Sequence, residues 1–393
     1  MQAKKLFYTT MIGMFLAVLP ATQAQSFSVL HEFAGGSDGA FPVGGVTLDA
    51  KGNVSGTTSD GGSFSVGVVF KVNKGNNETV PLAFDESNGA FPGSTMIEDQ
   101  AGNFYGTADE GPGGAGVIFK VSPQGKEKLL YAFQGGTGNN ARVPSGSPLL
   151  DKSGDIYGTT IKGGKGSCLF GCGAVYRLDT AGKLHVLYTF SGGRDGNEPY
   201  GPLVQDAAGN LYGVALYGGD LSCPEFPQQG CGVVFELAKS GKLTVLHTFK
   251  GPDGASPQPG LLMDHAGNLY GAAGYGGHAE NGLLFKISST GKYTILHKFN
   301  GTDGSTPNGE LVADSTGNLY GTAQTGGSDM LYGTIFEMTT TGHLDVLYSF
   351  AGGQDGANPF SGVARDAAGN LYGTAYQNFQ FFQRDGDVWE LKP

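Results

Sequence analysis

The sequence predicts an all-β protein, a seven-bladed β-propeller of four-stranded blades. A run close to Gly-Asn-Leu-Tyr-Gly recurs seven times at intervals of about fifty residues, a period typical of solenoids and propellers. Glycine accounts for 70 of 393 residues and hydrophobic residues for 39%, which suits a turn-rich protein with a β core. Because the repetition runs from end to end, we expect one propeller domain over residues 25–393.

Residues 1–24 precede the repeats and have the order of a secretory signal peptide. Lys4 and Lys5 come before an apolar stretch that ends at Leu19, and small residues follow up to Ala24. The stretch is too short for a comfortable membrane span. We therefore expect cleavage after Ala24, no membrane insertion of the mature chain, and a secreted or periplasmic location.

A single repeat shows four short strands joined by turns. In the fifth repeat the expected strands are residues 260–263, 269–272, 282–287 and 294–299, separated by segments rich in Gly, Asn, Asp and Ser. Four short strands at this spacing form one propeller blade. A blade cannot bury both faces alone, so neighbouring blades must stack. The repeats begin near residues 28, 79, 128, 184, 243, 293 and 344.

The order of strands at the chain ends predicts how the ring closes. Residues 28–33 match the fourth strand of the other repeats, whereas the chain ends on a third strand, residues 387–391. The last blade lacks its outer strand, and the N-terminus has a spare one. We expect the N-terminal strand to complete the last blade, because that blade would otherwise expose an unpaired edge.

An aspartate opens the first hairpin turn of every repeat. Asp at this position can cap backbone N–H groups, and the Gly that follows supplies a positive φ. Calcium is the alternative, but one carboxylate per turn is far short of the roughly six to eight oxygens that calcium takes. We expect a structural turn. The residues are Asp49, Asp99, Asp151, Asp206, Asp264, Asp314 and Asp366.

Aromatic residues recur at fixed positions of the second and third strands. Rings at these positions can fill the space between blades or stack on a ligand, and we favour packing. The third-strand row is Phe70, Phe119, Tyr176, Phe235, Phe285, Phe336 and Trp389. The second-strand row is Tyr105, Tyr157, Tyr212, Tyr270, Tyr320 and Tyr372, with Ser55 in the first repeat.

The long, variable loops are expected on one face of the ring, and ligand binding is expected there. Asp-Gly pairs in the connections between blades either form turns, which we favour, or give a negative opening for a cationic or polyhydroxyl ligand. An aromatic insertion in the seventh repeat, residues 377–384, is a platform for a sugar or partner, or else a plug at the seam. The candidate ligand-binding residues are Asp38, Asp195, Asp253, Asp303, Asp355, Phe379, Phe381 and Phe382.

The four cysteines lie in equivalent loops of the third and fourth repeats. An even count in an exported chain predicts two local disulfides, Cys168–Cys172 and Cys223–Cys231. A zinc site of four thiolates is the alternative, which the irregular spacing and the oxidising compartment disfavour. We expect no metal and no cofactor. The net charge of −11 leaves no basic stripe for nucleic acid.

The full recurring pattern is Leu-Tyr-Gly-Thr, Gly-Gly, Gly-x-Val-Phe-Lys/Glu-Leu, Leu-x-x-Phe and Asp-Gly-x-x-Pro. Over residues 28–391 it resembles the GloVer tandem repeat, the Gloeobacter/Verrucomicrobia repeat of exported bacterial proteins. The resemblance implies no known activity and no catalytic residue. That family is linked to surface proteins with sorting anchors, whereas this chain ends on the propeller, which favours release or periplasmic residence.

The chain shows no nucleophile elbow, no HExxH and no phosphate loop. We therefore expect a monomeric, noncatalytic scaffold that binds a polysaccharide or a partner protein at the long-loop face. A purely structural envelope protein and an exported polysaccharide lyase or glycoside hydrolase are the alternatives, since propellers also host enzymes. A hydrolase would need two carboxylates in one cleft. The loop carboxylates considered for this role are Asp195, Glu198, Asp220, Glu225, Asp253, Asp303 and Asp385.

Overall fold

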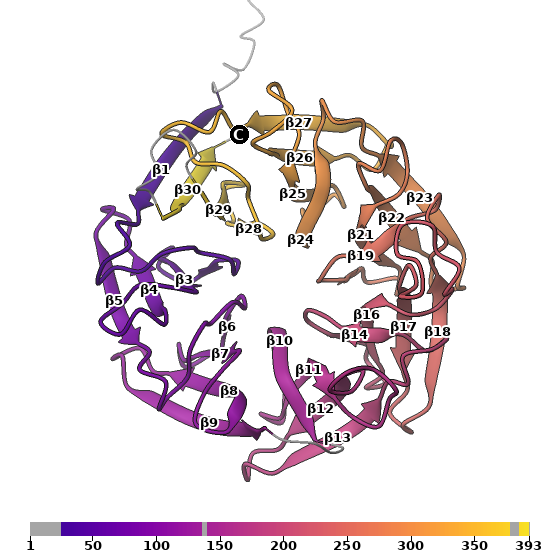
Figure 1. Cartoon of the computed structure of the whole chain (residues 1–393). Helices are drawn as coiled ribbons and strands as arrows, with labels where there is room; N and C mark the ends of the chain where they lie inside the picture. The colour runs from indigo at the N-terminus through magenta and orange to yellow at the C-terminus, as the bar shows by residue number, and fades with distance from the viewer. Residues whose placement is uncertain (1–24, 136–139, 378–384, 393) are drawn as a thin grey trace, which may run out of the picture.

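The computed structural model describes residues 25–135, 140–377 and 385–392, which form seven antiparallel sheets arranged as the blades of a ring (Figure 1). The all-β class and the seven four-stranded blades predicted from the sequence are confirmed. The described residues contain no helix that is long and apolar enough to cross a membrane. The expected signal peptide, residues 1–24, lies outside the described residues.

Each blade has an inner, a second, a third and an outer strand position, and Figure 1 shows the inner strands converging on the middle of the ring. The inner strands are β2 (Thr47–Leu48), β6 (Ile97–Glu98), β10 (Ala141–Leu150), β14 (Asn197–Pro199) with β15 (Val204–Gln205), β19 (Ala255–Pro257) with β20 (Leu262–Met263), β24 (Ser305–Ala313) and β28 (Ala364–Arg365). The second strands are β3 (Val54–Thr58), β7 (Phe104–Ala108), β11 (Ile156–Gly163), β16 (Leu211–Tyr217), β21 (Leu269–Tyr275), β25 (Leu319–Thr325) and β29 (Leu371–Ala375).

The third and outer strands complete the blades. The third strands are β4 (Val68–Val72), β8 (Gly114–Val121), β12 (Ala174–Leu178), β17 (Val233–Leu237), β22 (Leu283–Ile287), β26 (Thr334–Met338) and β30 (Asp387–Lys392). The outer strands are β5 (Glu78–Ala83), β9 (Glu127–Gln134), β13 (Leu184–Thr189), β18 (Leu243–Thr248), β23 (Tyr293–Lys298), β27 (Leu344–Ser349) and, in the last blade, β1 (Ser26–Glu32).

The first and last strands of the chain belong to one blade. β1 pairs antiparallel with β30, with Phe27 opposite Leu391 and Val29 opposite Trp389. The sheet order is β1-β30-β29-β28, and Figure 1 shows β1 at the rim beside β30. β1 therefore occupies the outer position of the last blade, the position that β5, β9, β13, β18, β23 and β27 occupy in the other blades. That this pairing keeps the ring closed stays a prediction.

Neighbouring blades contact each other through pairs of buried aromatic rings. A phenylalanine at the end of each outer strand, or directly after it, packs edge-on against the third-strand aromatic of the next blade, as Phe84 does on Phe119 at 5.1 Å between ring centroids. This arrangement confirms the packing role expected for the third-strand row. The pairs are Phe33–Phe70, Phe84–Phe119, Phe133–Tyr176, Phe190–Phe235, Phe249–Phe285, Phe299–Phe336 and Phe350–Trp389.

The side-chain ring of the third-strand aromatic explains why the recurring Leu-Tyr-Gly run ends in glycine. Gly271 lies opposite Phe285 in the pairing of β21 with β22. A Cβ on Gly271 would come within 2.6 Å of the Phe285 ring, closer than real Cβ contacts allow. A side chain at this position would push the ring out of the contact between blades.

A second contact between blades forms where each inner strand begins. The residue before its proline has a positive φ, as in Ser256 at 50°, which is uncommon for a residue other than Gly. The Ser256 N–H donates to the carbonyl of Cys231 in the preceding blade at 2.9 Å, and Pro257 packs against Gly232. The residue and proline pairs are Phe41–Pro42, Phe91–Pro92, Val143–Pro144, Glu198–Pro199, Ser256–Pro257, Thr306–Pro307 and Asn358–Pro359.

The junction between the last and first blades has the same contacts. The Phe41 N–H donates to the carbonyl of Asp385 at 2.7 Å, and a Cβ on Gly386 would lie 2.4 Å from Cδ of Pro42. Within the last blade, the Phe33 N–H donates to the carbonyl of Gly386 at 3.0 Å, as the Phe84 N–H donates to that of Gly67 within the first blade. The chain ends therefore meet through contacts equivalent to those between blades that are consecutive in the chain.

The turn aspartates are used within their own hairpins, as expected. Oδ1 of Asp264 accepts the N–H groups of Ala266 and Asn268 at 2.9 and 2.8 Å. Oδ2 accepts the Asn268 side-chain amide at 2.7 Å and the Tyr270 hydroxyl at 3.1 Å. The second-strand tyrosines thus hold the turns.

Deleting residues 26–33 is expected to lower the melting temperature markedly. The last blade would lose its outer strand, and Phe70 would lose its contact with the Phe33 ring. Phe33→Ala alone should cost about 3–5 kcal/mol of unfolding free energy. Circular dichroism during heating and in denaturant measures both. Ser28→Ala, at an exposed position of the same strand, is the matched control and should stay within about 0.5 kcal/mol of the parent protein. An unchanged melting curve after the deletion would contradict a closing role for β1.

Two glycines of the fifth blade separate the cost of the contact between blades from the cost of a positive φ. Gly282 and Gly291 have φ of 86° and 85°, but a Cβ on Gly282 would lie 2.5 Å from Pro307, whereas one on Gly291 meets nothing within 4 Å. Gly291→Ala should cost about 1–2 kcal/mol. Gly282→Ala should cost about 1–3 kcal/mol more. Equal losses in denaturant unfolding would show that the proline contact contributes nothing.

Candidate functional site

A cavity of about 330 Å³ lies where the inner strands of all seven blades meet, and we call it the axial cavity. Figure 1 shows these strands converging from every blade. The volume is at the lower end of the roughly 300–1,000 Å³ typical of small-molecule sites. Because every blade contributes to its wall, the axial cavity is the candidate functional site.

The axial cavity lies toward the long-loop face. Its lining comes from the middle of β10 and β24, from the equivalent inner segments of the other blades, and from residues in or next to the ends of second strands, including Thr107, Asp109 and Ile161. The end of a second strand is where the long loop to the third strand begins. The cavity is therefore on the side of the ring where the sequence predicted ligand binding.

Small residues let the inner strands approach each other closely around the cavity. A Cβ on Gly309 would lie 1.9 Å from the backbone nitrogen of Gly362, in the next blade. The threonine of the Leu-Tyr-Gly-Thr run ties neighbouring blades here. Its hydroxyl donates to an inner-strand carbonyl of the next blade, as Thr322 does to Ser361 at 2.7 Å and Thr374 to Gly44 at 3.3 Å.

One carboxylate interrupts this lining of small residues. Glu310, on β24, accepts a hydrogen bond at Oε1 from the Ser147 hydroxyl of β10 at 2.9 Å, which joins the sixth blade to the third across the cavity. Burial raises the pKa of the Glu310 carboxyl, and the hydrogen bond from Ser147 opposes this in part. The residues at the same position of the other inner segments are Gly45, Thr95, Ser147, Pro202, Gly260 and Gly362.

A second carboxylate, Asp109, lines the cavity together with Tyr200. Asp109 keeps contact with solvent, but the protein around it and the nearby Glu110 carboxylate raise its pKa to about 6. Burial and the charge of Asp109 raise the pKa of Tyr200. Tyr200 and Phe360 are 37% and 38% exposed, so the wall offers two accessible aromatic rings.

The Asp-Gly aspartates cap turns beside the outer strands and do not line the cavity. Oδ1 of Asp303 accepts the N–H of Asn300 at 2.9 Å, and Oδ2 lies 2.9 Å from Nε2 of His297. The equivalent pairs are His31–Asp38, Tyr188–Asp195, His247–Asp253 and Tyr348–Asp355. His and Tyr interchange on the outer strand because both can reach this carboxylate. A ligand-binding role for these aspartates stays a prediction.

The other loop carboxylates named from the sequence are also separate from the axial cavity. Glu198 forms an ion pair with Lys162, and Asp220 accepts the N–H and hydroxyl of Ser222. The expected aromatic platform of Phe379, Phe381 and Phe382 lies outside the described residues. Sequence reasoning missed Asp109, Tyr200, Glu310 and Phe360. Only Glu310 carried a signal, as the one charged residue at its position among the seven inner segments.

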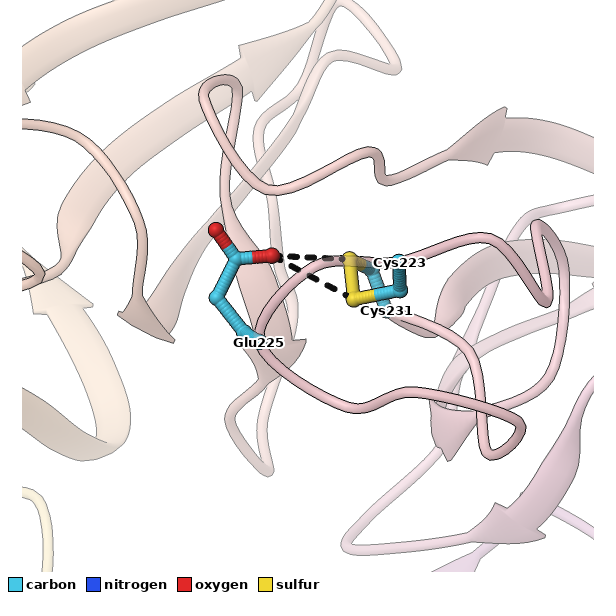
Figure 2. Close-up of side chains that lie close together, drawn as sticks. All are labelled: Cys223, Glu225 and Cys231. Carbon is cyan, nitrogen blue, oxygen red and sulfur yellow. Dashed lines mark hydrogen bonds between the residues drawn. A yellow bond between two sulfur atoms is a disulfide. The ribbon is translucent and has the colours of Figure 1, made fainter.

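Both expected disulfides, Cys168–Cys172 and Cys223–Cys231, are present. Figure 2 shows the Glu225 carboxylate beside the second, with Oε2 at 3.4 and 3.5 Å from the two sulfurs. The three side chains are close enough together to hold a metal ion. Metal binding by cysteine needs thiolates, and sulfurs joined in a disulfide are not thiolates. With the disulfide formed, the cluster cross-links the loop and offers no thiolate ligand.

A family model of the Gloeobacter/Verrucomicrobia repeat matches residues 9–168 and 143–389. Among solved structures, the chain is similar to the extracellular domains of two hybrid two-component systems of B. thetaiotaomicron. The first is 12% identical with a TM-score of 0.59, over 93% of this chain and 39% of that chain. The second is 13% identical with a TM-score of 0.55, over 93% of this chain and 41% of that chain. This chain thus spans about two fifths of either one.

A gluconolactonase of Xanthomonas campestris is 16% identical over 81% of this chain and 89% of that chain, with a TM-score of 0.47. That similarity is too weak to bear on activity. The two Bacteroides structures are similar in fold alone, because their identity is low. Comparison with curated protein sequences finds no match.

Thiol labelling of the unfolded, unreduced protein is expected to add nothing to its mass, because both disulfides use all four cysteines. Labelling after reduction should add four groups. Reduction should cost about 2–2.6 kcal/mol of stability per bond, since each closes a short loop. A label attached before reduction would contradict the pairing.

Proposed function

This chain belongs to the Gloeobacter/Verrucomicrobia repeat family, and we propose that it is an exported, monomeric scaffold that binds a carbohydrate chain at the axial cavity. The single observation that carries this proposal is the cavity itself, to which all seven blades contribute. Export is supported by two disulfides, which persist in oxidising compartments, and by the extracellular origin of the similar structures. In this proposal residues 1–24 are removed and residues 25–393 form the mature propeller.

The composition of the cavity wall suits a polyhydroxyl ligand. The Gln258 side-chain amide and the Tyr200 hydroxyl offer donors and acceptors for sugar hydroxyls. Tyr200 and Phe360 offer flat faces for the apolar side of a sugar ring. A few polar groups beside accessible aromatic rings are typical of ligand pockets. A protein partner on the long loops, the other ligand class open from the sequence, would not need the polar wall.

A polysaccharide lyase or glycoside hydrolase is the second candidate function, favoured by one observation. Asp109 and Glu310 line the same cavity, and the pKa of each is raised. A carboxyl with a raised pKa is what general acid catalysis near neutral pH requires. This pair replaces the loop carboxylates considered from the sequence, none of which lines the cavity.

Titration calorimetry with neutral oligosaccharides is expected to detect saturable binding by the mature protein. Tyr200→Ala and Phe360→Ala should each weaken binding about tenfold, because each removes a ring from the wall. Val346→Ala is the matched control, since Val346 is 39% exposed on the outer strand β27. Its binding should equal that of the parent protein.

Mass spectrometry of the same mixtures separates the two candidate functions. Intact oligosaccharides support the scaffold, and shortened products that vanish in Asp109→Asn support the enzyme. No binding across a panel of plant and bacterial glycans would contradict both. Binding that is unchanged in Tyr200→Ala and Phe360→Ala would show that the site lies outside the axial cavity.

A further inference from the structure

The charged side chains that line the axial cavity are both acidic. Among the described residues, its lining includes the carboxyl groups of Asp109 and Glu310 but no lysine, arginine or histidine. The remaining lining is apolar or carries neutral hydroxyl and amide groups. A ligand that enters this cavity meets negative charge with no counter-charge from the wall.

Glu310 is held in place by the narrowest part of the ring. A Cβ on Gly260 would lie 2.3 Å from Cγ of Glu310, and one on Gly362 would lie 2.1 Å from its carbonyl oxygen. The side chain therefore passes Gly260 of the fifth blade and reaches Ser147 of the third. Among the described residues, Oε1 has the Ser147 hydroxyl as its partner and Oε2 has no hydrogen-bond partner.

Elsewhere the chain places a cation beside partly buried carboxylates of the hairpin turns. Lys71 lies 2.8 Å from Asp49, and Lys120 lies 3.7 Å from Asp99. Arg177 lies 3.5 Å from Asp155. A carboxylate enclosed by protein is costly unless it is paired with an opposite charge. Glu310 is half-buried among the inner strands, yet the described residues offer it only a neutral hydroxyl.

We propose that the missing counter-charge comes from the ligand, and that the axial cavity selects a carbohydrate bearing a primary ammonium group, an amino sugar. The ammonium lies at Oε2 of Glu310, and Asp109 adds negative charge toward the long-loop side. An ammonium has three donors, so it can donate to Oε2 of Glu310 and to other acceptors of the wall. The inference rests on the proposed function, because it names the class of sugar that the same cavity binds.

An ammonium group beside Glu310 would also affect the pKa of the Glu310 carboxyl. Burial raises the pKa of Glu310, and an adjacent positive charge lowers it again and favours the carboxylate. The pairing is strengthened because the protein partly shields Glu310 from solvent, and it adds to the contacts that a neutral sugar makes with Tyr200 and Phe360. The ammonium group therefore discriminates between sugars of equal size.

Three matched probes test the inference by titration calorimetry at pH 7: a β-1,4-linked glucosamine trimer, its N-acetylated form and the corresponding glucose trimer. The glucosamine trimer is expected to bind at least about tenfold more tightly than the other two at low salt. Glu310→Gln should remove most of that advantage, because glutamine keeps an acceptor for Ser147 but carries no negative charge. Asp345→Asn, an exposed acid on β27, is the control and should change nothing.

Each remaining outcome of the titration decides a different point. Equal binding of the glucosamine and glucose trimers, insensitive to Glu310→Gln, overturns the ammonium site and leaves the carbohydrate scaffold standing. No binding of any trimer or other glycan overturns both. Binding of calcium chloride alone that is lost in Glu310→Gln also overturns the inference, because it assigns the carboxylate to a metal. If Glu310→Gln does not fold, Asp109→Asn must weaken glucosamine binding selectively for the inference to stand.

Discussion

The ring depends on the contact between a proline that begins an inner strand and a glycine of the preceding blade. At each junction the residue before the proline takes a positive φ, and at six of the seven it donates its N–H to the preceding blade, as Ser256 does to Cys231. That backbone conformation is unfavourable in isolation, so the surrounding contacts must hold it. The glycine is required because any Cβ at Gly232 would overlap Pro257. The aromatic pairs and the threonine hydroxyls then add packing and polar contacts to the same interface.

The size and lining of the axial cavity follow from this junction between blades. Because the blades approach backbone to backbone at the axis, most inner positions hold glycine, serine or proline, and the space left among them is small. A single long side chain at this radius can cross the ring, which is how Glu310 reaches Ser147. The architecture thus makes one substitution in one repeat sufficient to define the chemistry of the cavity.

The fold was predictable because its determinants are periodic and local. Turn aspartates, third-strand aromatics and cysteine spacing each act within one repeat, and the spare strand at the N-terminus follows from counting strands. The axial cavity was not predictable in the same way, since Asp109, Tyr200 and Phe360 come from different blades and meet only when the ring forms. The Asp-Gly aspartates drew attention by recurrence, and the structure places them in turns beside outer strands, where Asp303 caps Asn300.

The most direct test of the account is hydrogen exchange at the residues that precede the junction prolines, measured by NMR or by peptide-resolved mass spectrometry. The Phe41 amide bonds to Asp385 across the junction of the last and first blades, and the Ser256 amide bonds to Cys231 within the chain order. The account predicts that both are protected to a similar degree, because the two junctions are equivalent. Fast exchange of Phe41 beside slow exchange of Ser256 would contradict it, since the ring would then open where the chain ends meet.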